Sequence, residues 1–166
     1  MLNLFASRKT VKTVAERLYA AAVSRSREPV FFVTFGVSDT LDGRFDLLTL
    51  HAVLVLTQLK TNPVLAQAFI DRLFTGFDEA LRELGAGDMG LGAKLKRMGN
   101  AFHGRLKAYE EAQDEAAMSE ALSRNLFRGA PCAPQMTAYV LGAKQHLALT
   151  EEGEVDFGPL PFASRS

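Results

Sequence analysis

The sequence predicts an all-α fold, a single-domain orthogonal or antiparallel bundle of about six helices. Apolar residues recur at helical spacing through most of the 166 residues. Capping residues, prolines and glycines separate these periodic segments. The chain is 48% hydrophobic, so it can bury a core without disulfides or metals. One apolar stretch, at residues 29–37, is predicted to be extended, but no second strand of similar quality is present to form a sheet.

Residues 40–60 are predicted to form a central helix around which the others pack. Asp39 and Thr40 are residue types that accept hydrogen bonds from backbone N–H groups at a helix start. The apolar residues that follow cover most of the circumference, so this helix should be buried on nearly every side. Asp46 and His51 interrupt the apolar run, which is therefore shorter than the roughly 20 residues that span a membrane.

The first 35 residues are predicted to contain a basic, amphipathic helix at about Ser7 to Arg25, followed by the extended stretch. They carry six basic and two acidic residues. A solvated helix face explains this excess, and so does a docking surface for anionic lipid or RNA. The four cations on which the second interpretation depends are Arg8, Lys9, Lys12 and Arg17.

After the central helix, Asn62 and Pro63 are predicted to start a helix that ends at Gly85. Because a short turn joins these two helices, they are expected to form an antiparallel hairpin. The glycine-rich segment at 85–92 matches neither GxxxxGK nor GxGxxG, and Asp88 is predicted to cap the next helix instead of facing a phosphate. Three further helices are predicted at about Leu91–Ala112, Ala116–Phe127 and Gln135–Leu149.

Residues 1–149 are predicted to form the helical domain, and residues 150–166 an acidic, proline-containing C-terminal tail. Its prolines prevent a regular helix. The tail is expected either to be partly disordered or to be held in a groove by Phe157 and Phe162.

The composition excludes several classes of function. Nineteen basic and nineteen acidic residues cancel, so no overall field attracts DNA or an anionic membrane. Cys132 is the single cysteine, which excludes an intrachain disulfide and a CxxC-type zinc or redox site. The N-terminal segment lacks the apolar core of a secretory signal. Interpreted as the first helix of the mature protein, it favours a bacterial cytoplasmic protein over an organelle precursor.

Three segments of the chain resemble the ubiquinol-cytochrome c chaperone family. They are SDTLDGRFDLLTLH from Ser38, LGAGDMGLGAKLKRMGNAFHGRLKAY at 84–109 and LSRNLF at 122–127. The likeness covers roughly Leu18 to Leu149 in the family's order. It implies a non-enzymatic assembly factor, without a cofactor, that holds newly made cytochrome b for haem acquisition and entry into the bc1 complex.

The same resemblance implies partners and a location. Newly made cytochrome b would be the client. In mitochondrial relatives a second small assembly factor and the ribosomal exit region are involved, so the candidate partners are a ribosome, an inner-membrane surface and a second small factor. The expected location is the bacterial cytoplasm, peripheral at the inner membrane, in preference to the mitochondrial matrix.

The candidate client-binding residues lie in the first two of these segments. Arg44 stands out because a cation near a helix N-terminus is poorly placed for the helix dipole. It is expected either to pair with a carboxylate from another helix, such as Asp39 or Asp88, or to contact the client. The full candidate set is Asp39, Asp42, Arg44, Phe45, His51, Arg97, Phe102, Arg105 and Tyr109.

Two other functions stay open on the residues alone. A small helical enzyme would need a pocket near His51, Asp39 and Arg44. An RNA- or lipid-binding module would use the basic first helix. The three histidines stand at no diagnostic spacing and no nucleophile motif is present, so no catalytic residue, metal ligand or cofactor is predicted.

Overall fold

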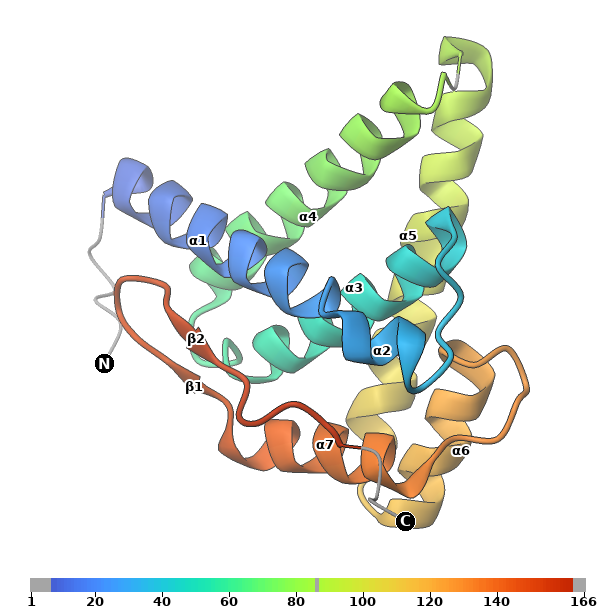
Figure 1. Cartoon of the computed structure of the whole chain (residues 1–166). Coiled ribbons are helices and arrows are strands. Elements are labelled where there is room, and N and C mark those ends of the chain that lie inside the picture. The colour runs from blue at the N-terminus through green and yellow to red at the C-terminus, as the bar shows by residue number, and fades with distance from the viewer. Residues whose placement is uncertain (1–6, 86, 163–166) are drawn as a thin grey trace.

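A computed structural model describes residues 7–85 and 87–162, and within them the fold is all-α apart from one small β-hairpin (Figure 1). The predicted all-α class is therefore confirmed. The helices with eleven residues or more in this part of the chain are α1 (Arg8–Ser26), α3 (Leu41–Thr57), α4 (Pro63–Glu83), α5 (Asp88–Glu111), α6 (Glu115–Asn125) and α7 (Pro134–His146). The shorter elements are the five-residue helix α2 (Pro29–Val33) and the strands β1 (Ala148–Leu149) and β2 (Val155–Asp156).

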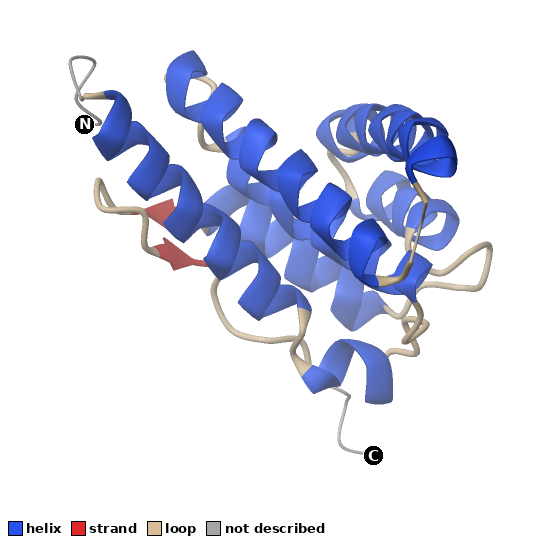
Figure 2. Cartoon of the chain, turned by 90° about the horizontal axis from the view of Figure 1, so that it is seen from above, coloured by secondary structure: helices blue, strands red, loops and turns tan. Residues whose placement is uncertain are grey.

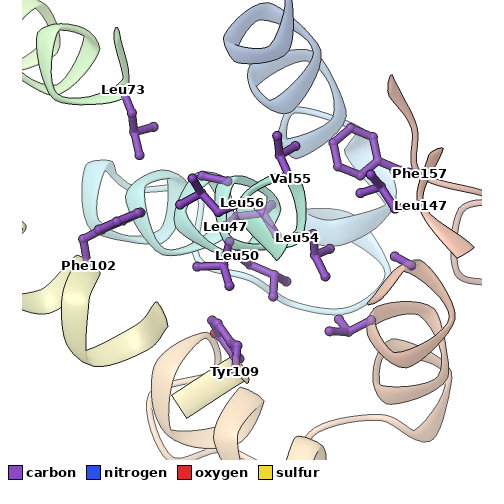
Figure 3. Close-up of a cluster of buried hydrophobic side chains, with 14 of the residues drawn as sticks. Leu47, Leu50, Leu54, Val55, Leu56, Leu73, Phe102, Tyr109, Leu147 and Phe157 are labelled. Atoms are coloured by element: carbon purple, nitrogen blue, oxygen red, sulfur yellow. The ribbon is translucent and has the colours of Figure 1, made fainter. Parts of the chain in front are cut away.

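The central helix is α3, and other elements enclose it as predicted. Thr40 caps it, because its hydroxyl oxygen accepts a hydrogen bond from the backbone N–H of Gly43 at 3.1 Å. Eleven of its seventeen residues are buried. Each fully buried leucine contributes roughly 1.5–3 kcal/mol to folding. Figure 3 shows the α3 residues Leu47, Leu50 and Leu54 among side chains of other elements, including Leu73, Phe102, Tyr109 and Phe157.

Helix α4 makes its main backbone contacts with α1 and α5. It meets α3 through side chains, as where the ring centroids of Phe45 and Phe77 lie 5.0 Å apart. The two helices therefore do not form the closely packed antiparallel hairpin that was predicted. Figure 2 shows α1 and α4 side by side. Gly76 permits this close approach, because a Cβ there would lie 2.2 Å from the hydroxyl oxygen of Tyr19 on α1. Helix α1 also contacts α3, and so takes the place beside the central helix that was expected for α4.

The segment at 29–37 begins as a helical turn, which corrects the predicted extended stretch. Pro29 occupies the first position of α2, where its fixed φ and missing N–H suit a helix start. With no strand to pair with, the backbone closes its hydrogen bonds locally, as in Val37 N–H to Phe31 O at 3.0 Å. Phe31 and Val37 are buried, so the apolar character of the segment reflects packing and not strand pairing.

Most helix boundaries match the prediction, and three differ from it by three residues. Helix α3 ends at Thr57, before the predicted Lys60. Asn62 caps α4 through a hydrogen bond from Leu65 N–H at 3.2 Å, and Gly85 closes it with a φ of +80°. Helix α5, however, begins at Asp88 with Gly87 as its N-cap, so half of the glycine-rich segment is helical. Helix α7 ends at His146, before the predicted Leu149, because the chain turns there into β1.

The C-terminal residues that the structure describes, up to Phe162, include a hairpin and a segment that contact α1. Strands β1 and β2 pair antiparallel. Arg17 donates a hydrogen bond to Glu152 O at 3.0 Å, and Arg25 donates one to Gly158 O. Of the two aromatic residues predicted to hold this segment, Phe157 is buried and Phe162 is exposed.

Candidate functional site around Asp46

The segment DTLDGRF, residues 39–45, forms the turn before α3 and its first turn. Arg44 donates a hydrogen bond from Nε to Asp39 Oδ1 at 2.8 Å. The side chains of Arg44 and Asp39 are 62% and 61% exposed, so this pair contributes no more than about 1 kcal/mol to stability. Asp39 is thus the carboxylate that holds Arg44, and it precedes the same helix instead of belonging to another one.

Gly43 sits where this turn approaches the helix most closely. A Cβ at this position would lie 1.8 Å from the carbonyl oxygen of Ser38. No side chain can occupy that space unless the backbone of the preceding turn moves. The glycine in DTLDGRF is therefore required by backbone packing.

Asp46 lies one turn further along α3 and is buried between two arginines. Arg105 of α5 forms an ion pair with it, with Nη2 2.8 Å from Oδ1. Arg128, in the turn after α6, donates a hydrogen bond to the other oxygen at 3.1 Å. Burial raises the pKa of the Asp46 carboxyl above its ordinary value, and the two guanidinium groups oppose that rise. This charge cluster links α3, α5 and the segment after α6.

A pocket with a volume of about 400 Å³ opens over this cluster between α3 and α5. We call it the α3–α5 pocket. Its charged lining has more cations than carboxylates. The guanidinium carbon of Arg105 lies 5.2 Å from the centroid of the Phe45 ring, a cation–π contact. The charged lining residues are Lys94, Arg97, Arg105, Arg128, Asp42 and Asp46, and the apolar ones are Leu41, Phe45, Leu81, Met98 and Ala101.

A second hollow, of about 540 Å³, adjoins the first between α1, α3 and α4. Leu41, Phe45 and Met98 line both spaces, so the two form one continuous surface, here called the α3–α5 surface. Asp39 and Arg44 lie at the edge of the second hollow. Its most exposed large apolar residue is Leu84 at the end of α4. The surface therefore combines apolar side chains with a charged border, and the excess of cations in that border lies at the α3–α5 pocket.

Three of the predicted site residues lie in the core. Phe102 and Tyr109 on α5 and His51 on α3 are almost completely buried, so their side chains do not form part of this surface. His51 donates a hydrogen bond from Nδ1 to Leu47 O at 2.9 Å, because that carbonyl can only accept. Its Nε2 then accepts one from the Tyr139 hydroxyl at 2.9 Å. The histidine is sealed and fully hydrogen-bonded.

The arrangement does not provide the enzyme site considered from the sequence. His51 lines none of the cavities that border Asp39 and Arg44, whose side chains face solvent. Among the residues that the structure describes, no three His, Cys, Asp or Glu side chains gather to hold a metal ion. In the same part of the chain, no helix is long and apolar enough to cross a membrane.

The buried histidine predicts how stability depends on pH. Burial lowers the pKa of His51 from 6.5 to about 4. The unfolded chain therefore binds a proton that the folded chain excludes, and stability is lost as pH falls from the unfolded pKa towards the folded one. We expect a loss of about 2 kcal/mol between pH 7.5 and pH 5, measured by urea unfolding. In His51→Gln this part of the pH dependence should disappear, and an unchanged slope would contradict the assignment.

The four cations of the basic first helix lie apart from Asp46. Arg8, Lys9, Lys12 and Arg17 line a separate groove, with a volume of about 1210 Å³, between the first turns of α1 and those of α4. The structure therefore divides the predicted site residues into an α3–α5 set and an α1 set.

Comparison with known proteins gives the family. The model of the ubiquinol-cytochrome C chaperone family matches residues 33–158, which include α3, α5 and the charge cluster. The chain belongs to the ubiquinol-cytochrome c chaperone family. A solved structure described as the Cbp3 homolog from Brucella abortus is 35% identical, covers 82% of this chain and 81% of its own, and superposes with a TM-score of 0.74. A search of curated proteins gave no match. Membership in a chaperone family implies a role that is not enzymatic.

The sequence did not point to two residues, Arg128 in this site and Lys144, which lies outside it and supports α5. Arg128 was overlooked because it follows a helix end, where a lone arginine usually faces solvent; its φ of +54° and the adjacent Gly129 mark the turn that aims it at Asp46. Lys144 of α7 was also missed. Its ammonium group donates to Tyr109 O and Ala112 O, both at 2.9 Å, and so closes the end of α5.

Proposed function

We propose that this protein is an assembly chaperone that binds newly made cytochrome b and supports assembly of the ubiquinol-cytochrome c reductase (bc1) complex. Membership in the ubiquinol-cytochrome c chaperone family supports the general role. The client, cytochrome b, is the proposed part. Holding such a client requires a surface for apolar segments and a way to fix the charged residues beside them.

The α3–α5 surface is the observation that carries this proposal. Its two adjoining hollows share apolar lining at Leu41, Phe45 and Met98. Membrane-destined helices are apolar along their length and carry polar or charged residues at their ends. An apolar floor beside a cationic border suits such a segment, because the floor covers apolar side chains and the border attracts acidic ones.

A strain that lacks the protein tests the proposal. We expect less cytochrome b on a blot and a weaker haem b absorption band, and restoration of both by the wild-type chain. Leu84→Asp should fail to restore them, because it places a charge in the apolar floor. Val33→Asp is the matched control, since Val33 is exposed and lines none of the cavities described above. Normal cytochrome b in the deletion strain would reject the client.

Arg44 gives a sharper prediction, because its ion pair with Asp39 contributes little to stability. Arg44→Ala should change the free energy of unfolding by less than about 1 kcal/mol and leave the amount of chaperone unchanged. Cytochrome b accumulation should nevertheless fall. Arg124→Ala removes a similar exposed pair, with Glu120 at 2.9 Å, and is expected to affect neither quantity. Loss of the chaperone itself in Arg44→Ala would instead show that the pair is structural.

The proposed location is the bacterial cytoplasm, peripheral at the inner membrane, where a newly made cytochrome b is inserted. A ribosome and a second small assembly factor are proposed as partners at that place, following the family's mitochondrial members. Cell fractionation tests the location: the protein should pellet with membranes and be released by salt. Recovery only after detergent treatment would contradict a peripheral association.

A further inference from the structure

The groove between α1 and α4, here called the α1–α4 groove, has no part in the site around Asp46. Its volume of about 1210 Å³ is the largest of the cavities described here. Its α1 wall lies before residue 33, where the family match begins. Figure 2 shows the two helices side by side from above. The lining on α1 runs from Arg8 to Arg17, a length of about 15 Å at about 1.5 Å per residue.

The floor of the α1–α4 groove is apolar. Val64, at the second position of α4, is 65% exposed although it is a large apolar side chain. Beside it lie Pro63, Ala68 and the half-buried Val11 of α1. A single exposed valine is ordinary, but an apolar floor along a concave surface is typical of a binding site.

The rim of the groove is positively charged. Arg8, Lys9, Lys12 and Arg17 line it, against two carboxylates, Glu16 and Asp71. Both carboxylates already have partners: Arg72 pairs with Glu16, and Gln67 donates a hydrogen bond to Asp71 at 2.8 Å.

Three of the four rim cations have no such partner. Among the described residues, Arg8, Lys9 and Lys12 form no ion pair. The first turn of α1 also holds no acidic residue, so Arg8 and Lys9 stand where the helix dipole disfavours positive charge. These cations therefore do not stabilise the helix, and a negatively charged partner would relieve the repulsion.

We propose that the α1–α4 groove binds an amphipathic α-helix of a partner protein, with an apolar stripe flanked by Asp or Glu residues. The floor would receive the stripe, and the rim cations would face the acidic flanks. The concave shape favours a helix over a membrane, because a flat membrane surface contacts convex parts of a protein and does not enter a groove. The apolar floor favours it over RNA, whose phosphates gain nothing from Val64 or Ala68. This site is independent of the proposed cytochrome b client.

A synthetic peptide tests the proposal on the full chain. The probe is a fluorescent helix of about 15 residues with leucines on one face and glutamates on both flanks, and its twin carries lysines in place of the glutamates. Anisotropy titration should show binding of the glutamate peptide and at least about tenfold weaker binding of the lysine peptide. Higher salt should weaken binding of the glutamate peptide.

Variants locate the binding on the molecule. Val64→Asp should weaken binding of the glutamate peptide at least about tenfold, because it places a charge in the floor. Val33→Asp, at an 83% exposed valine outside the groove, should have no effect. Lys12→Glu should also weaken binding, whereas Lys107→Glu on α5 should not. The substituted side chains are exposed, and equal unfolding midpoints would verify that the variants fold.

Four results would overturn the proposal. The first is equal binding of the two peptides, and the second is wild-type affinity in Val64→Asp. The third is that the protein binds vesicles of anionic phospholipid, that Val64→Asp abolishes this binding, and that the peptide does not compete with the vesicles. The occupant of the groove would then be a membrane. The fourth is peptide binding that appears only after removal of residues 1–6, since the groove would then belong to the chain's own N-terminus.

Discussion

Asp46→Ala is expected to lower the free energy of unfolding by about 3–5 kcal/mol. The carboxylate of Asp46 is almost completely buried and is held by Arg105 and Arg128. Without it, Arg128 can turn to solvent because its side chain is half exposed, but Arg105 stays mostly buried without a counter-ion. An unpaired charge in that position costs far more than the ion pair contributes to stability.

Urea unfolding measures this effect against two controls. Asp42→Ala removes an exposed carboxylate on the same helix and should change stability by less than about 1 kcal/mol. The double variant Asp46→Leu with Arg105→Met replaces both charges by apolar groups and should recover most of the loss. If Asp46→Ala were as stable as Asp42→Ala, the buried charge cluster would not link α3 to α5 as described.

Gly43→Ala is expected to destabilise the protein by about 3 kcal/mol or more. Alanine normally favours a helix over glycine by about 1 kcal/mol, so helix propensity alone predicts the opposite sign. Here the added Cβ would lie 1.8 Å from the carbonyl oxygen of Ser38, and backbone atoms cannot move aside as a flexible side chain can. The turn that carries Asp39 would be displaced, and with it the pair between Asp39 and Arg44.

Gly104→Ala is the matched control for this prediction. Gly104 also lies in a helix, and a Cβ there meets nothing within 4 Å. This substitution should stabilise the protein by up to about 1 kcal/mol. Thermal unfolding should show a lower midpoint for Gly43→Ala and an equal or higher midpoint for Gly104→Ala. A neutral or stabilising effect of Gly43→Ala would contradict the close approach of residue 43 to the carbonyl oxygen of Ser38.

The sequence predicts elements well where the signal is local. Thr40 and Asn62 mark helix starts by their own hydrogen-bonding chemistry, and the structure has both caps. At 29–37 two local signals conflict, since Pro29 favours a helix start while the β-branched and aromatic residues favour a strand. The proline prevails because, among the described residues, no strand pairs with this segment. The pairing of α4 with α1 brings Gly76 against Tyr19, a contact that no local pattern indicates.

The candidate site is only partly predictable for a similar reason. Arg97 and Arg105 could be named because the charges of α5 cluster in the sequence. The contact from Asp46 to Arg128 joins residues that are 82 positions apart, and it depends on how α3, α5 and α6 are packed. Phe102 and His51 were named from segments that carry a family resemblance, but their buried positions show that such segments also contain core residues.

The most direct test of the account is a photo-crosslinker placed on the α3–α5 surface in cells that synthesise cytochrome b. Position 97 is exposed and lines the pocket above Asp46, whereas position 33 is also exposed and lies outside it. We expect a crosslinked product that contains cytochrome b from position 97 and none from position 33. Cytochrome b captured equally from both positions, or from neither, would contradict the assignment of this surface as the client-binding site.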